Sequence, residues 1–239
     1  MPPLFLILPI LFAGAIFSTI AGGGLGILLT LAATFFIDIR TSIILVSLLG
    51  FIIQLAKLAH FHTYVRWDMV SWYLLAGIPA SFSGAFLLFI LPERVLEVSL
   101  AALCLVYVVM HMFHLMPRLK PTRTTLMTVG AMNGAVGGIL GHGALLRLPA
   151  LLSFGLTKEQ FVGTSAFLAF FMNAGKASVY VWRFPWSEEA VILFLAAIPT
   201  VFIGTWCGRL LLRYVSEDHF EKLLLCVIVF GAIRLLFFP

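Results

Sequence analysis

Charged residues are scarce in this sequence: Asp, Glu, Lys and Arg make up 10% of its 239 residues, whereas hydrophobic residues make up 62%. A soluble domain of this length cannot bury so much apolar surface. Backbone groups in lipid must be hydrogen-bonded within their own element, and the apolar runs lack the alternation of barrel strands. The sequence therefore predicts an all-α integral membrane protein in a lipid bilayer.

Acidic residues are absent from the interior of every strong apolar run, because all 10 of them fall at run ends. A cation carrier normally needs a buried carboxylate in the membrane, so the sequence favours an anionic substrate. It also lacks a paired acid and base, a nucleophile beside a histidine and a metal-binding set. We therefore expect a protein that is not an enzyme.

Cysteine is rare as well, and Cys104, Cys207 and Cys226 lie in apolar segments without CxxC spacing. This excludes a disulfide framework, and no His, Glu or Cys grouping has metal-ligand spacing, so we expect no metal or other cofactor. Basic residues stand at the ends of apolar runs, which argues against nucleic acid as a partner. The opening Met-Pro-Pro lacks a basic region, so we expect a retained first segment rather than a cleaved signal peptide.

The sequence does contain an internal repeat. At a constant offset of 119 positions, polar and glycine residues of the two halves align: Gly22, Gly24, Gln54 and Lys57 with Gly141, Gly143, Asn173 and Lys176. At an offset of 120, one more than before, Ile78-Pro79 and Gly84 align with Ile198-Pro199 and Gly204. We therefore predict a first repeat at 1–116, a polar linker at 117–125 and a second repeat at 126–239.

Each repeat opens with an apolar stretch that is too long for one span and is interrupted by glycine, and three further stretches follow. We expect apolar segments at about 3–37, 41–59, 69–91 and 95–116, then at 126–156, 160–182, 190–212 and 223–238. If each opening stretch is a broken hairpin or crosses twice, nine Lys and Arg lie on one side and four on the other. By the positive-inside rule this predicts inverted repeats, a cytoplasmic linker and both termini outside.

The glycine breaks are the first candidate for a binding site. A helix broken near mid-membrane has free N–H groups and a positive dipole end that favour an anion. The residues concerned are Gly22, Gly23 and Gly24 in the first repeat and Gly141, His142 and Gly143 in the second. We expect non-helical backbone near 21–26 and 140–144. The alternative is that these glycines serve close helix packing.

Two amide and lysine pairs recur at matching positions. Gln54 precedes Lys57 by three residues, and Asn173 precedes Lys176 by three, so each amide shares a helix face with its lysine. In such a pair the ammonium supplies charge and the amide orients an oxyanion. The alternative is that both lysines extend to the membrane interface.

Three more polar residues belong to the candidate site. His142 within the second break can titrate and couple proton movement to the substrate, or it can stay neutral and bond to a carbonyl. Thr164 and Ser165 begin the segment that carries Asn173. Their hydroxyls either line the path or bond to the preceding helical turn.

Several of these motifs resemble the TauE/SafE family of sulfite and organosulfur anion exporters. The resemblance lies in the repeated glycine break, in Pro149-Ala-Leu-Leu-Ser-Phe-Gly-Leu-Thr157, in Val162-Gly-Thr-Ser-Ala166 and in the two Ile-Pro pairs. It implies a bacterial or archaeal permease of the cell inner membrane that exports a small sulfur oxyanion. The sequence departs from the family pattern at Thr30, where proline is usual.

We therefore expect a secondary carrier that exports sulfite or a related organosulfonate by alternating access, with its site between the two repeats. The alternative is an anion channel, which the same lysines and helix ends would serve. A scaffold does not explain why polar residues recur at matching depths. The sequence leaves open whether the chain forms a homodimer.

Overall fold

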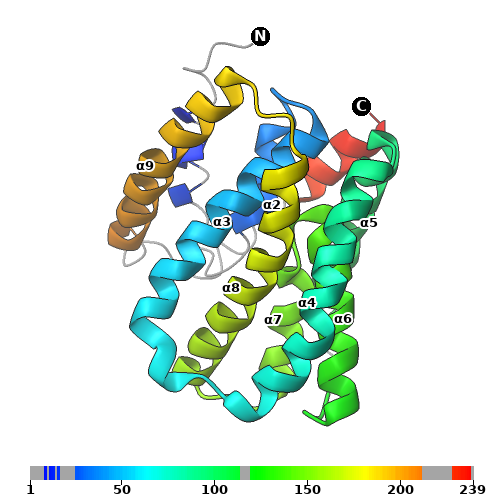
Figure 1. The fold of residues 1–239 in the computed structure, drawn as a ribbon, viewed down its shortest axis with the longest axis vertical. Coiled ribbons are helices and arrows are strands. Elements are labelled where there is room, and N and C mark those ends of the chain that lie inside the picture. The colour runs from blue at the N-terminus through cyan, green and yellow to red at the C-terminus, as the bar shows by residue number, and fades with distance from the viewer. Residues whose placement is uncertain are drawn as a thin grey trace. The chain divides into compact units, whose positions relative to one another are not determined.

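The computed structural model describes residues 8–9, 11–13, 15–16, 25–113, 119–211 and 228–237. The described residues form helices joined by short turns, without strands, as Figure 1 shows. The helices are α2 (Leu25–Ala33), α3 (Ile39–Phe61), the short η1 (His62–Tyr64), α4 (Trp67–Ile90), α5 (Glu93–Met112), α6 (Arg123–Leu140), α7 (Ala144–Ser153), α8 (Lys158–Arg183), α9 (Glu188–Leu211) and a last helix, Ile228–Phe237. The all-α prediction is confirmed.

The helices follow the predicted apolar stretches closely. The stretch expected at 69–91 is α4, and the stretch expected at 160–182 is α8. Within the described residues, α4 has both the length and the apolar composition for a membrane crossing, and shorter apolar helices lie at Ile39–Ile52, Ala144–Ser153 and Ile228–Phe237. Hydropathy therefore located the helices to within a few residues.

The chain divides into two compact units. Unit 1 comprises Met1–Leu49, Pro92–Val109 and Pro185–Pro239, and unit 2 comprises Gly50–Leu91 and Met110–Phe184. Each unit draws on both halves of the sequence, because α4 of the first half belongs to unit 2 and α9 of the second half belongs to unit 1. The repeat boundaries at 1–116 and 126–239 stay a prediction.

In unit 2, α4 and α6 lie side by side with their backbones in contact (Figure 1). Three glycines of α6, spaced four residues apart, make this possible: Gly130, Gly134 and Gly138. A Cβ added to any of them would lie 2.3 Å from a carbonyl oxygen of α4. Small residues at this spacing let membrane helices approach closely. These glycines fix the distance between the two helices that flank the site described below.

The ends of α6 and α8 are set by local capping. The hydroxyl of Thr122 accepts a hydrogen bond from the backbone N–H of Thr125 at the start of α6. At the start of α8, Thr157 and Gln160 form a reciprocal capping box. Each device satisfies backbone donors that a helix start leaves unpaired. Local capping therefore defines where α6 and α8 begin.

Candidate functional site

The second glycine break is present and separates α6 from α7. Gly141 has φ 79°, a left-handed conformation that favours glycine, and it ends α6. Gly143 precedes α7, whose first turn has no side-chain cap. The predicted non-helical segment is thus confirmed for 141–143, while Leu140 and Ala144 at its edges are helical.

The first break lies mostly outside the described residues, which include none of Gly22, Gly23 and Gly24. The prediction that non-helical backbone extends to residue 26 is wrong, because Leu25 and Gly26 are already part of α2. The reason is the run of apolar residues that follows, since it propagates a helix through a single glycine at modest cost.

Lys176 of α8 is buried, with 3% of its surface exposed. Its ammonium donates to the carbonyl oxygens of Gly141, at 2.7 Å, and Gly137, at 3.3 Å. One turn further along α8, the Tyr180 hydroxyl donates to the carbonyl oxygen of Gly138. These carbonyls form the last turn of α6, where the helix dipole is negative. Lys176 is thus directed at the end of α6 and not toward solvent.

Asn133 of α6 faces the break. Its amide nitrogen donates to the sulfur of Met172 at 3.1 Å, while its amide oxygen is buried without a hydrogen-bond partner. A Cβ on Gly143 would lie 2.1 Å from that oxygen. His142 is also buried, and it lies near Lys176. The absence of a side chain at Gly143 thus lets the amide of Asn133 lie against the break.

Arg147 lies one turn into α7 and is buried, with 6% of its surface exposed. Its Nε donates to the hydroxyl of Ser165 at 3.2 Å. Its guanidinium is near enough to Lys176 for their charges to repel. Ser165, which the sequence made a candidate, therefore contacts a cation that the sequence analysis did not select.

Tyr73 of α4 completes this group. Its side chain is fully buried, and its hydroxyl has no hydrogen-bond partner. It lies beside Asn133 and within electrostatic range of Arg147. We name Tyr73, Asn133, Arg147, Ser165 and Lys176 the polar cluster of unit 2. It joins one residue of the first half of the sequence to four of the second.

The other candidate residues are placed as follows. Thr164 is buried, and its hydroxyl accepts from the backbone N–H of Arg66 at 3.0 Å, so it anchors the start of α4. Asn173 is half-buried on α8. Gln54 is half-buried on α3, and Lys57 lies on α3 with its side chain outside the described part. The structure thus brings Lys176, His142, Gly141, Gly143 and Ser165 into one region.

Arg147 carries a signal in the sequence itself, because it lies inside the apolar stretch at 126–156. An arginine inside an apolar stretch without a nearby acid is as informative as the lysine at 176. Tyr73 and Asn133 carried no such signal, since both residue types occur in ordinary packed membrane helices. Only the fold shows that their polar atoms come together.

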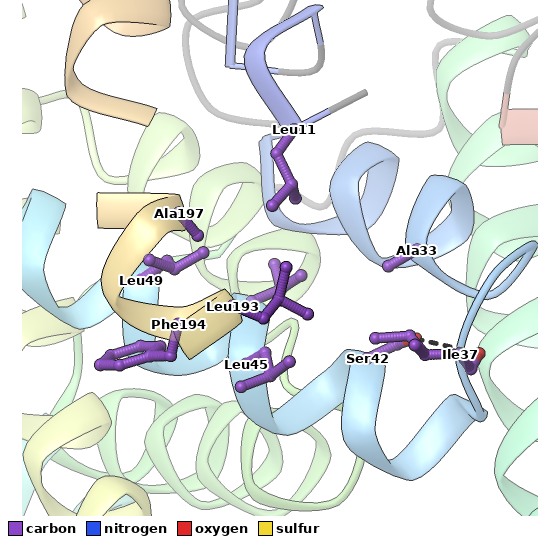
Figure 2. A pocket seen from close by; sticks show the side chains of 10 residues that line it. Leu11, Ala33, Ile37, Ser42, Leu45, Leu49, Leu193, Phe194 and Ala197 are labelled. Carbon is purple, nitrogen blue, oxygen red and sulfur yellow. Dashed lines mark hydrogen bonds between the residues drawn. The ribbon is translucent and has the colours of Figure 1, made fainter. Parts of the chain in front are cut away.

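Unit 1 has a pocket, shown in Figure 2. Its lining is apolar and includes Leu45 and Leu49 of α3 and Leu193 of α9. The one hydroxyl there, that of Ser42, donates to the carbonyl oxygen of Ile37 at 3.5 Å. The apolar lining does not suit a small anion, and none of the candidate site residues belongs to it.

A comparison with protein families matches residues 6–235 to the family described as Sulfite exporter TauE/SafE. Searches among curated proteins and among solved structures give no match.

Proposed function

Because the chain belongs to the sulfite exporter TauE/SafE family, we propose that it exports sulfite or a related organosulfonate across the cell inner membrane by alternating access. The family match over residues 6–235 supports a membrane transporter with a small anionic substrate. The polar cluster of unit 2 supplies the local chemistry that such a substrate requires.

The observation that carries the proposal is the pair of buried cations. Arg147 and Lys176 are both buried, and no Asp or Glu in the described ranges is. A charged side chain inside a membrane costs on the order of 3 kcal/mol on insertion scales. An anion that enters beside these two cations offsets that cost, whereas a cation would add to their repulsion.

The proposed substrate site comprises residues of both repeats. From the first repeat it takes Gly22, Gly23, Gly24, Gln54 and Lys57, and from the second it takes Gly141, His142, Gly143, Thr164, Ser165, Asn173 and Lys176. The contacts of Lys176, His142, Gly143 and Ser165 in unit 2 support the second set. The first set rests on the repeat in the sequence.

Two glycine contacts support the inverted-repeat architecture. In unit 2, a Cβ on Gly84 of α4 would lie 2.5 Å from the carbonyl oxygen of Ala135. In unit 1, a Cβ on Gly204 of α9 would lie 2.8 Å from the carbonyl oxygen of Phe12 and from Cβ of Ala15. Gly84 and Gly204 are counterparts in the repeat, and their partners match to within about one helical turn. Each half therefore packs its Ile-Pro helix on the opening helix of the other half.

We propose that the 117–125 linker is cytoplasmic and that both termini lie outside. The Lys and Arg distribution supports this orientation. Single cysteines introduced in the linker and at the C-terminus of a chain without native cysteines should react with a membrane-impermeant reagent from opposite sides. Labelling of both positions from the same side would contradict it.

The export proposal is tested with purified protein in liposomes. Flux of sulfite, thiosulfate, sulfate and sulfoacetate should saturate with concentration, and unlabelled substrate on one side should drive counterflow of labelled substrate. Flux that does not saturate and shows no counterflow would favour the anion channel instead. Absence of flux for all four anions would refute the proposed substrate class.

A further inference from the structure

The guanidinium of Arg147 has more hydrogen-bonding capacity than the protein uses. A guanidinium carries five N–H donors in a planar fork. Among the described residues, Arg147 makes one hydrogen bond, from Nε to the Ser165 hydroxyl, and it forms no ion pair. That bond fixes the orientation of the fork. The terminal nitrogens, which suit two oxygens of one anion, are left for another partner.

Two other polar atoms of the cluster also lack partners. The Tyr73 hydroxyl and the Asn133 amide oxygen are both inaccessible to solvent, and the two side chains lie near one another without either atom forming a hydrogen bond of good geometry. Buried polar groups are almost always hydrogen-bonded. Two such groups without a good hydrogen bond, near a buried cation, therefore indicate a place where a ligand can bind. The hydroxyl can donate to an anion oxygen, while the amide oxygen can accept from water or from the hydroxyl itself.

We propose that Arg147 and Tyr73 contact the transported anion directly, and that Lys176 supplies the second positive charge of a site for doubly charged oxyanions. This inference rests on the proposed function and adds to its site two residues from α7 and α4. Ser165 is a positioning residue, because it acts on the anion through the Arg147 fork.

The preference for two charges follows from the balance of the cluster. Arg147 and Lys176 act on one another electrostatically, and the described acids all lie exposed or half-buried. A doubly charged oxyanion is attracted by both positive charges with twice the charge of a monoanion, so it gains more from two cations close together. Thiosulfate and methanesulfonate make a suitable pair of probes, because both are tetrahedral sulfur oxyanions and they differ by one charge.

A purely structural role for Arg147 predicts different behaviour. If the guanidinium only held α7 against α8, then its replacement would lower stability and leave anion affinity unchanged in the protein that still folds. Tyr73→Phe separates the two roles more clearly. Removal of an unpaired buried hydroxyl should leave the melting temperature of the empty protein equal or higher, while removal of an anion ligand should weaken binding.

The test is isothermal titration of the purified full chain at pH 8 with sulfite, thiosulfate and methanesulfonate. Arg147→Gln should bind both dianions at least about 30-fold more weakly, and Arg147→Lys should recover part of this loss, because the charge returns without the fork. Tyr73→Phe should weaken binding by about fivefold. Arg183→Gln is the matched control, since Arg183 is an exposed cation of unit 2, and it should bind like wild type.

Lys176→Gln should bind thiosulfate more weakly than wild type does. The ratio of its affinities for thiosulfate and methanesulfonate should also be smaller than in wild type. Equal affinities of wild type for the two probes would overturn the preference for dianions. Dianion affinity within threefold of wild type in Arg147→Gln would overturn the assignment of Arg147 as a ligand. If Arg147→Gln does not fold, the dianion affinities of Arg147→Lys and Tyr73→Phe test the assignment instead. Wild-type dianion affinity in both of these variants would overturn it.

The failure of this inference and that of the proposed function can be told apart. Sulfite binding that survives Arg147→Gln refutes the inference and leaves the exporter proposal standing. If wild type binds phosphate but none of the sulfur oxyanions, and Arg147→Gln abolishes phosphate binding, then the anion site stands and the proposed substrate fails. Absence of binding to every anion refutes both.

Discussion

The cations of unit 1 and those of unit 2 have different surroundings. In unit 1, Arg40 lies 3.6 Å from Glu93, and Arg94 lies 3.1 Å from Glu97 while it also donates to the Leu235 carbonyl oxygen. In unit 2, Arg147 and Lys176 are buried and bond to a hydroxyl and to carbonyl oxygens. Carboxylates thus lie beside these two arginines of unit 1, whereas a hydroxyl and carbonyl oxygens lie beside Arg147 and Lys176.

Glycines let helices pack closely in both units, but the helix backbones approach more closely in unit 2. The glycines of α6 would place a Cβ 2.3 Å from α4 backbone oxygens, and Gly204 of unit 1 would place one 2.8 Å from a backbone oxygen. Gly50 of α3, which lies in unit 2 but away from this helix contact, has open space around it. Unit 2 is thus the more tightly packed at its helix contact, as a site with fixed polar groups requires.

The largest effect should come from Gly138→Ala. Its Cβ would lie 2.3 Å from the Ser81 carbonyl oxygen, and backbone atoms on both sides cannot yield locally. We expect destabilisation of about 3 kcal/mol or more, or failure to fold. Thermal melting of the detergent-purified variant measures it.

Gly204→Ala and Gly50→Ala complete that comparison. Gly204→Ala should destabilise by less than Gly138→Ala, and Gly50→Ala is the control, because a helical alanine without steric conflict is neutral or slightly stabilising. Equal melting temperatures for all three variants would show that the α4–α6 contact is looser than the structure indicates.

Lys176→Ala should have the next largest effect, and it should affect two properties. The carbonyl oxygens of Gly137 and Gly141 lose a charged donor in a buried site, which should cost about 1 to 3 kcal/mol of stability. Sulfite affinity should fall as well, because a nearby positive charge is removed. Titration calorimetry and melting on the same samples measure both.

Arg234→Ala is the matching change in unit 1. Arg234 donates to the Thr34 hydroxyl at 2.9 Å and lies over the Phe35 ring at 4.5 Å. It should lower stability without a change in sulfite affinity. Loss of sulfite binding in Arg234→Ala, with Lys176→Ala unaffected, would place the anion site in unit 1.

Gly143→Ala should have a smaller effect, because the nearest group in its way is a side chain and the backbone carbonyl oxygen of Asn133 lies further off, at 2.9 Å. The added Cβ would lie 2.1 Å from the amide oxygen of Asn133, which can rotate aside at the cost of its contact with Met172. We expect a loss of about 1 to 2 kcal/mol. Asn133→Ala in the same chain should relieve the steric part, so the two changes should combine to less than their sum. Strict additivity would contradict this contact.

The sequence was sufficient for the helices and for part of the candidate site. Apolar stretches gave α4 and α8 to within a few residues, and the glycine pattern located the break at 141–143. Lys176 stood out because a lysine inside an apolar helix is costly. Local signals of this kind follow from periodicity and composition alone.

The remainder depended on contacts between distant segments. Tyr73 and Asn133 are ordinary residues until α4 and α6 pack together, and the Gly130, Gly134 and Gly138 row gains its meaning from the α4 backbone opposite. The division into two units that each combine both halves also follows from packing and not from the order of the sequence.

The smallest effect expected is that of Thr157→Ala at the start of α8. The Thr157 hydroxyl accepts from the backbone N–H of Gln160 at 3.3 Å, and the Gln160 side chain bonds back to the Thr157 N–H at 3.2 Å. Loss of one half of this box should cost about 1 kcal/mol. Thr157→Ser keeps the hydroxyl and is the control. Thr157 lies about five helical turns before Lys176 on α8, so sulfite affinity should be unchanged while the melting temperature falls in the alanine variant alone. A drop in affinity equal to that of Lys176→Ala would mean that the start of α8 controls the site, and that the rigid helix ends of unit 2 matter as much as its buried cations.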